Sequence, residues 1–332
     1  MTVNCLVDTA ESVRGLRLST YTFPHCERLT VRNTHQTPIP MDAPLSDSST
    51  SAPPRFQVQK TFVDARVLSG FMDDGHFRSF AGEYLASLDS AAQKEVLNLV
   101  EQSRAAAANL PVVDLGDAIA RPLTGTYVDA IETNPTFQGS FRNRPHKFAW
   151  IRPETVVALQ VHVKSRADPV PSGESELLQY TLPTKWDVPA EISLTPPLGP
   201  IYIMSSSPHM QGFEVQLDGA VGRVIIQPPK HINLIQVMHY SGRYYLRNGY
   251  HRLFDAVTAR IAEIPALVVE ALQPQDLNLP GFGAFNTGYT MGLPRPPLVS
   301  DFVGPEAIPI KMRERRYGVS IGLQVSPFNL GI

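Results

Sequence analysis

The stretch RYYLRNGYHRLFDA, residues 243–256, constrains the fold of this chain more than any other part of the sequence. Residues 244–247 have the alternation of a strand, Asn248-Gly249 interrupts it, and a helix-forming run follows. Asn248 is suited to cap that helix, and Gly249 lets the backbone approach a ligand closely. The first N–H groups of a helix lack intrahelical partners, and the helix dipole favours an anion there. The sequence therefore predicts a strand-to-helix junction that is suited to hold a phosphate.

Two side chains of the same junction strengthen this interpretation. His251 and Arg252 supply hydrogen-bond donors within the first helical turn, and an arginine can hold a phosphate through two parallel bonds. The alternative is structural, because both side chains could instead bond a neighbouring carboxylate such as Asp255. The residues on their own leave both readings open.

The flanking sequence predicts a mixed α/β fold. Val157–Val163 alternates apolar and polar residues as a half-buried strand does, and Ser241-Gly242 is typical of a hairpin turn. The helix after the junction is expected from about Tyr250 to near Ala262, and Ala266–Glu270 to form a short apolar strand. Further short strands are expected at residues 201–204, 213–217, 221–227 and 234–240.

A long helix is predicted upstream. Ser90 and Gln93 have the spacing of a capping box, the apolar residues between Val96 and Leu110 share one face, and Pro111 stops the helix. Residues 28–56 are rich in Pro, Ser and Thr, as disordered linkers are. We therefore expect a poorly ordered tail over 1–55, a helical and mixed portion over 56–147, a core over 148–272 and a Pro/Gly-rich extended arm over 273–332 that wraps the fold.

Composition excludes several functional classes. The 332 residues carry a formal net charge of -2, which gives no electrostatic footprint for nucleic acid. No apolar stretch approaches the roughly 20 residues of a membrane helix, and no signal-peptide pattern is visible. The two cysteines, Cys5 and Cys26, form no Cys/His cluster, so we expect no metal site on the protein. A cytoplasmic protein is expected.

The unit around the junction resembles the ParB/sulfiredoxin superfamily. Its members carry a strand, a Gly-x-His-Arg or Gly-x-Arg-Arg turn, a helix and an Ile-Pro-x-x-Val strand; here the turn is Gly249–Arg252 and the last strand begins at Ile264-Pro265. The strong match covers about thirty-five residues, and Trp150–Val163 resembles the opening segment of such domains. The chain is also similar to bacterial proteins that combine an NGYHR block with an RPPLVSDF-like segment.

The resemblance implies that the turn holds the phosphates of a nucleotide, ATP or CTP with Mg²⁺, or of a phosphorylated small molecule. Gly249, His251 and Arg252 are the matching contacts, with Asn248 as their capping neighbour. The chain departs from the family in having no helix-turn-helix pattern downstream, Tyr250 where sulfiredoxins have cysteine, and no acidic catalytic residue that can be placed by motif. We therefore expect a nucleotide- or phosphate-binding protein, with hydrolysis of a nucleotide or transfer of a phosphoryl group as the reactions considered. The alternative is a non-catalytic interaction protein that reuses the fold, with DNA binding as a weaker third.

Other polar residues are weaker candidates. Gln160 and His162, on the polar side of the expected strand, are possible pocket-lining residues, as are Ser207 and His209 in a polar loop after a strand. The segment Asp73-Asp74-Gly75-His76 is interpreted as a polar turn rather than a metal site. The basic cluster of Arg142, Arg144, His146 and Lys147, followed by Trp150, is interpreted as a solvated loop or as a contact for a phosphate.

Overall fold

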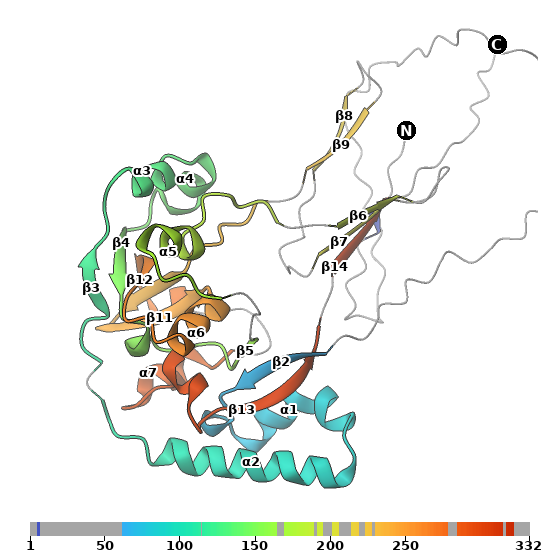
Figure 1. Ribbon diagram of the computed structural model, residues 1–332, viewed down its shortest axis with the longest axis vertical. Coiled ribbons are helices and arrows are strands. Elements are labelled where there is room, and N and C mark those ends of the chain that lie inside the picture. Colours follow the sequence, from blue (N-terminus) through green and yellow to red (C-terminus); the bar gives the residue numbers. More distant parts are fainter. Residues whose placement is uncertain are drawn as a thin grey trace, which may run out of the picture. The chain divides into compact units, whose positions relative to one another are not determined.

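The computed structural model divides the chain into two compact units (Figure 1). Unit 2 comprises Thr61–Asp187 and Lys230–Glu314, and unit 1 comprises Met1–Lys60, Val188–Pro229 and Arg315–Ile332. The structure describes residues 5–6, 62–113, 115–164, 169–188, 191–194, 201–205, 214–218, 223–227, 230–277, 284–314 and 317–321. Helices and sheets occur together in unit 2, so the predicted mixed α/β class is confirmed. Among the described residues, no helix is long and apolar enough to cross a membrane.

The central sheet of unit 2 has five strands in the order β11-β10-β12-β4-β3. These strands are β3 (Ile119–Pro122), β4 (His146–Ile151), β10 (Gln236–Tyr240), β11 (Arg243–Asn248) and β12 (Ile264–Glu270). β10 and β12 pair in parallel, and the other neighbours pair antiparallel. Ser241 and Gly242 join β10 to β11 with φ angles of 47° and 74°, as a tight hairpin turn of two left-handed residues requires. The predicted hairpin is therefore confirmed.

The predicted apolar strand after the junction is the centre of this sheet. In β12 the first six residues, from Ile264 to Val269, are buried, as expected for a strand that is covered on both faces. Helix α5 (Glu174–Thr181) packs against β12, and Phe137 of α4 (Pro135–Phe141) lies 5.8 Å from the ring of Phe148 on β4. A neighbouring helix, α3 (Thr126–Glu132), contacts α4.

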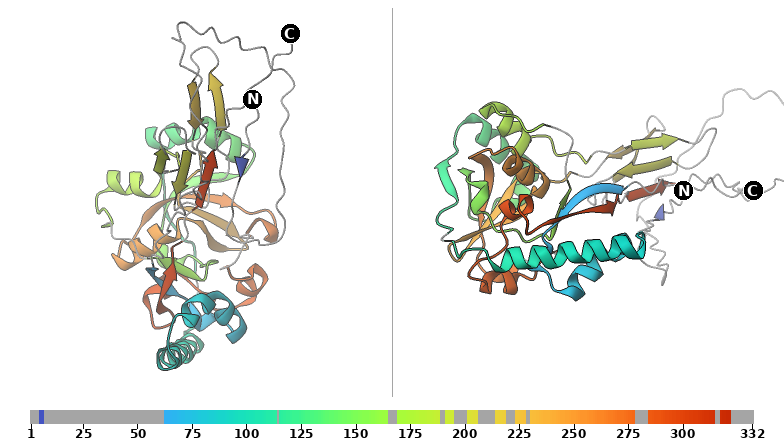
Figure 2. Two further views of the ribbon diagram at one scale, coloured as in Figure 1. Left: turned by 90° about the vertical axis from the view of Figure 1, so that its right-hand side faces the viewer. Right: turned by 60° about the horizontal axis from the view of Figure 1, so that its bottom comes forward.

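A second sheet in unit 2 has the order β13-β2-β5 and is antiparallel throughout. Its strands are β2 (Phe62–Val67), β5 (His162–Lys164) and β13 (Ile308–Arg313). Helices α1 (Asp74–Ala86) and α2 (Ser90–Ala108) lie against β13 (Figure 2). The long predicted helix is thus α2, but its N-cap is Asp89 rather than Ser90. The Asp89 carboxylate accepts the Ala92 N–H at 2.8 Å, and a negative group suits the positive end of the helix.

The remaining elements of unit 2 are short. They are the helices α6 (Tyr250–Thr258) and α7 (Thr287–Gly292) and the 3₁₀ turns Ser69–Phe71, Pro153–Thr155, Pro274–Leu277 and Val299–Val303. The expected helix to Ala262 is therefore shorter than predicted. It ends where Arg260 adopts a left-handed φ of 56°.

Unit 1 is built from β-strands in its described parts. One antiparallel sheet has the order β1-β14-β7-β6, from β1 (Cys5–Leu6), β6 (Glu191–Leu194), β7 (Ile201–Ser205) and β14 (Tyr317–Ile321). The strands β8 (Glu214–Asp218) and β9 (Arg223–Gln227) form a hairpin. The expected tail over 1–55 lies outside the described residues apart from β1. Three of the predicted short strands, at 201–204, 213–217 and 221–227, correspond to β7, β8 and β9.

The boundaries expected for the core, residues 148–272, differ from those of unit 2. Residues 188–229 cluster with unit 1, whereas β3 and the whole of 284–314 cluster with unit 2. The C-terminal segment belongs to unit 2 because its backbone is hydrogen-bonded to residues 156–158. The Ala158 N–H donates to Pro297 O at 2.8 Å, and the Val299 N–H donates to Val156 O at 2.9 Å. Within this segment, Arg295 and Asp301 form a buried ion pair at 2.6 Å.

The expected half-buried strand over Val157–Val163 is also different. Only His162–Lys164 is a strand, and Val157 forms bridges to Tyr245 on one side and to Leu298 on the other. Val157 and Ala158 are both fully buried although they point to opposite faces, because tertiary neighbours cover each face.

Candidate functional site

The predicted junction between strand and helix is present in unit 2. β11 ends at Asn248, Gly249 occupies the N-cap in the left-handed conformation (φ 90°, ψ 23°), and α6 begins at Tyr250. A Cβ atom on Gly249 would lie 2.7 Å from Cγ1 and 3.0 Å from Cα of Ile235. Glycine is therefore required here both by its backbone conformation and by the closeness of the neighbouring chain.

Asn248 does not cap α6 with its side chain, contrary to expectation. Its Nδ2 donates to Ile232 O at 3.3 Å, and its Oδ1 accepts the N–H of Gly249 at 2.8 Å. The helix N-cap itself has no side-chain hydrogen bond. Asn248 thus fixes the entry to the turn rather than satisfying the first-turn N–H groups.

Arg252 is a structural anchor in this conformation. The residue is only 6% exposed, and its guanidinium donates to Tyr180 O at 3.0 Å, Thr181 O at 3.2 Å and Asn233 Oδ1 at 2.9 Å. Tyr180 and Thr181 are the last residues of α5, where backbone carbonyls lack intrahelical partners. The hydroxyl of Tyr180 in turn donates to Asp255 Oδ2 at 3.1 Å. Arg252 thus donates to two carbonyls at the end of α5 and to the amide of Asn233. From the sequence we expected a phosphate or a nearby carboxylate as its acceptor.

His251 lies beside Lys164, the last residue of β5 in the second sheet. The side chain is partly buried, and its Nδ1 accepts the N–H of Lys164 at 3.0 Å. An imidazole that accepts at Nδ1 carries its proton on Nε2 when it is neutral.

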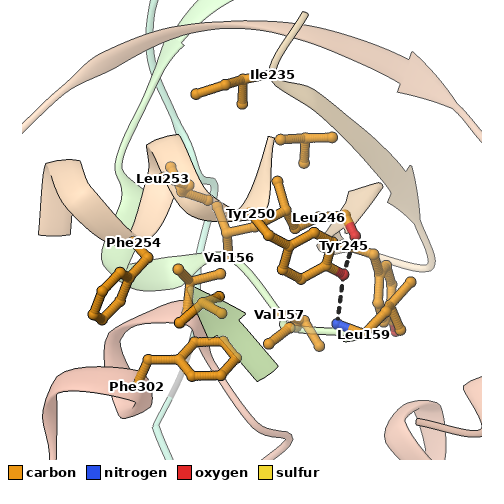
Figure 3. Close-up of a cluster of buried hydrophobic side chains, with 14 of the residues drawn as sticks. Val156, Val157, Leu159, Ile235, Tyr245, Leu246, Tyr250, Leu253, Phe254 and Phe302 are labelled. Atoms are coloured by element: carbon orange, nitrogen blue, oxygen red, sulfur yellow. Dashed lines mark hydrogen bonds between the residues drawn. The ribbon is translucent and has the colours of Figure 1, made fainter. Parts of the chain in front are cut away.

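Tyr250 is a central residue of the junction that sequence reasoning missed. Its hydroxyl accepts the N–H of Leu159 at 3.0 Å and donates to Leu246 O at 2.5 Å (Figure 3). It also accepts the N–H of Gln160 at 3.0 Å. Burial raises the pKa of this hydroxyl, against the lowering effect of the two N–H groups and of Arg247. The buried phenol of Tyr250 thus ties β11 to the segment around Leu159.

The other predicted candidates are distributed differently. Gln160 reaches the junction through its backbone N–H, and His162 lies partly buried with its ring 5.1 Å from that of Phe80. Ser207 and His209 lie outside the described residues. The structure thus brings the backbone of Gln160 next to the hydroxyl of Tyr250.

Arg247 is a second residue that the sequence did not single out. It directly precedes Asn248 and is partly buried. Burial lowers the pKa of its guanidinium; the hydroxyl of Tyr250 opposes this, and the like charge of Arg144 lowers the pKa further. One member of the predicted basic cluster therefore acts on the strand that leads into the junction.

Arg142, Arg144 and Lys147 of the basic cluster are exposed, whereas His146 and the following Trp150 contact other side chains. The His146 ring stands edge-on to Phe137 at 5.2 Å, and Arg121 stacks on the buried ring of Trp150 at 4.1 Å. The Nζ atom of Lys147 lies 3.9 Å from Oε1 of Glu270.

No metal-binding group is found in the part of the chain that the structure describes, where no three His, Cys, Asp or Glu side chains come together suitably. Asp73 is instead the N-cap of α1, and its carboxylate accepts the His76 N–H at 2.7 Å. Residues 74–76, interpreted from the sequence as a polar turn, are instead the first residues of α1.

Comparison of the chain with protein-family models, with curated proteins and with solved structures found no match.

Proposed function

We propose that this chain is a nucleotide- or phosphate-binding protein with a ParB/sulfiredoxin-like core, and that the anion is received at the start of α6. The observation that carries the proposal is how this helix begins. Gly249 is left-handed at the N-cap and offers no side chain to the first-turn N–H groups. Phosphate oxygens are good acceptors for such groups, and the helix dipole adds to the attraction.

The order of elements supports the same proposal. A strand (β11), a Gly-x-His-Arg turn, a helix (α6) and the Ile264–Glu270 strand (β12) follow one another as in the superfamily, with β10 between the two strands in the sheet. This order of elements supports a ParB/sulfiredoxin-like core, and it carries no information about a reaction.

The division of roles within the turn differs from the motif-based expectation. Arg252 anchors α6 to the end of α5, so the cationic contact is assigned to Arg247 and the side-chain donor to His251. Burial lowers the pKa of the Arg247 guanidinium, and the like charge of Arg144 adds to that effect. A phosphate beside Arg247 would favour its charged form. Mg²⁺ would enter with ATP or CTP, held by the phosphates.

The second candidate is a non-catalytic interaction protein that reuses the fold. The observation that favours it is the burial of Arg252, which the superfamily motif assigns to phosphate and which here holds protein atoms. In that case the role of the turn is structural, and it connects β11 and α6 to the end of α5.

Calorimetric titration with ATP, CTP, GTP and ADP, each with and without Mg²⁺, separates the two candidates. We expect binding by the wild type and a ten- to hundredfold weaker affinity for Arg247→Ala, since a charge-assisted bond contributes about 1.5–3 kcal/mol. Arg78→Ala, an exposed arginine on α1, is the matched control and should bind like the wild type. Binding of none of the four nucleotides would favour the interaction protein. Equal losses in both variants would contradict the assignment of Arg247.

A further inference from the structure

A second group of polar side chains lies at the other end of β11 from the α6 turn. It consists of Asp117, Lys147, His239, Tyr244 and Glu270, from five separate segments of unit 2. Tyr244 is near the start of β11, whereas Gly249 follows the end of that strand. The group is therefore separate from the proposed phosphate site.

His239 and Glu270 form a close imidazole–carboxylate pair. They are direct partners in the parallel pairing of β10 with β12, and Nδ1 of His239 lies 2.7 Å from Oε2 of Glu270. Both residues stand at the carboxyl ends of these parallel strands.

Tyr244 and Asp117 hold the imidazole from another side. The Tyr244 ring stacks on the His239 ring with centroids 4.5 Å apart, and its hydroxyl donates to Asp117 Oδ1 at 2.6 Å. Burial and the bond to Asp117 raise the pKa of Tyr244, so this hydroxyl keeps its proton.

Asp117 itself remains ionised. Burial acts to raise its pKa, but hydrogen bonds from Tyr244 and from the Ile119 N–H, with the charges of Lys147 and His239, lower it below its usual value. The hydroxyl of Tyr244 is therefore bonded to the charged carboxylate of Asp117. The ring of His239 is held on one face by the stacked Tyr244 ring and at Nδ1 by Glu270.

The other nitrogen of His239 faces solvent. The side chain is 29% exposed, and within the described part of the chain Nε2 has no hydrogen-bond partner. When Glu270 is ionised it accepts the Nδ1–H, so the neutral ring presents the Nε2 lone pair outward. The Lys147 ammonium lies 3.9 Å from Oε1 of the same carboxylate. A base, the group that orients it and a cation thus occur together.

We propose that His239 is the general base of an ester-hydrolysing site at the carboxyl ends of β10 and β12, with Glu270 as its positioning residue and Lys147 as the cation that faces the oxyanion. The substrate class is a small carboxylic ester with a good leaving group. An imidazole held by a carboxylate is the usual arrangement for activating a hydroxyl or water, and a nearby cation stabilises the negative charge that develops on the carbonyl oxygen.

The proposed step balances without a further reactant. Nε2 of His239 takes a proton from water as the water oxygen bonds to the acyl carbon, and the carbonyl electron pair moves to the oxygen near Lys147. When this intermediate collapses, the bond to the leaving oxygen breaks, and the imidazolium returns the proton to that oxygen. The products are a carboxylic acid and an alcohol or phenol.

Hydrolysis of p-nitrophenyl butyrate by the full chain tests the proposal. We expect saturable turnover, about a hundredfold lower kcat/KM for His239→Gln, and an unchanged rate for the control His76→Gln on α1. Glu270→Gln should lower kcat, leave KM unchanged and move the pH profile of kcat, which loss of a merely structural contact would not do. Unsaturable hydrolysis, or equal losses in the two histidine variants, would overturn the proposal.

Chemical modification keeps the test decisive if His239→Gln does not fold. Diethyl pyrocarbonate acylates an exposed neutral imidazole, and the modified histidines can be mapped by mass spectrometry of peptides. Loss of esterase activity should follow modification of His239. Activity that disappears while His239 stays unmodified, or survives its full modification, would refute the assignment.

Discussion

Replacing Arg252 by alanine should destabilise unit 2 strongly. The guanidinium makes three hydrogen bonds, to Tyr180 O, Thr181 O and Asn233 Oδ1, in a residue that is only 6% exposed. A hydrogen bond to a charged group contributes about 1.5–3 kcal/mol, but such terms are not additive, and burying a guanidinium is itself costly. Removing one partner of a buried charged network costs about 3–5 kcal/mol. We expect a loss of this size in the unfolding free energy.

Tryptophan fluorescence during urea unfolding is the assay that isolates this unit. Both tryptophans of the chain, Trp150 and Trp186, lie in unit 2 and are buried, so their fluorescence reports the unfolding of that unit. Trp186 also donates from Nε1 to Pro183 O, close to the end of α5 that Arg252 holds. For a unit of this size, 1 kcal/mol corresponds to about 2–4 °C, so the melting temperature should fall by about 6–20 °C.

Two further variants make the result interpretable. Arg252→Lys should recover only part of the loss, because an ammonium group lacks the planar fork that reaches several acceptors. Arg78→Ala should change the unfolding free energy by less than about 0.5 kcal/mol, since that side chain is exposed. A loss below about 1 kcal/mol for Arg252→Ala, together with weaker phosphate binding, would falsify the structural role of this arginine.

The remaining predictions concern the glycines that flank β11 and the tyrosines Tyr244 and Tyr250. Gly249→Ala should lower the unfolding free energy by about 2–4 kcal/mol, because the alanine would be left-handed and its Cβ would collide with Ile235. Gly242→Ala should lower it by only about 1–2 kcal/mol, because that position is left-handed (φ 74°) but a Cβ there would meet nothing within 4 Å. Equal losses of the two variants in urea unfolding would contradict the collision with Ile235. Tyr250→Phe leaves two buried N–H groups without their acceptor and should cost about 2–4 kcal/mol by the same assay, and a neutral result would show that water replaces the hydroxyl. The folded pKa values of Tyr244 and Tyr250 are raised above 10.0, so the stability that they contribute is complete below pH 10 and is lost as pH rises above it. Unfolding free energies that stay level up to pH 12 would contradict this.

The sequence by itself determined the local architecture around the junction. The strand alternation before Asn248-Gly249, the helix-forming run after it, the Ser241-Gly242 turn and the apolar run after Ile264-Pro265 predicted β11, α6 and β12, and the structure has all three. The long helix α2 was predicted to within a residue at its start and two at its end. These features were predictable because strand alternation, helix periodicity and turn conformation depend on residues close together in the chain.

Tertiary structure alone decided what the polar side chains of the junction do. The motif identified Arg252 as a phosphate contact, but its carbonyl acceptors lie 71 and 72 residues away in sequence, on a helix whose end could not be placed beside α6 from local pattern. Tyr250 was passed over for the same reason, since the N–H groups that it accepts are 90 and 91 residues distant.

The pair of His239 and Glu270 shows the same limit most clearly. The two residues stand 31 positions apart, at the ends of strands that each look ordinary in the sequence. Their side chains meet only because β10 and β12 pair in parallel in one register, and a shift of one residue would move one of them to the opposite face. Local chemistry specified the elements, whereas register and burial, which depend on contacts across the whole unit, decided which side chains meet.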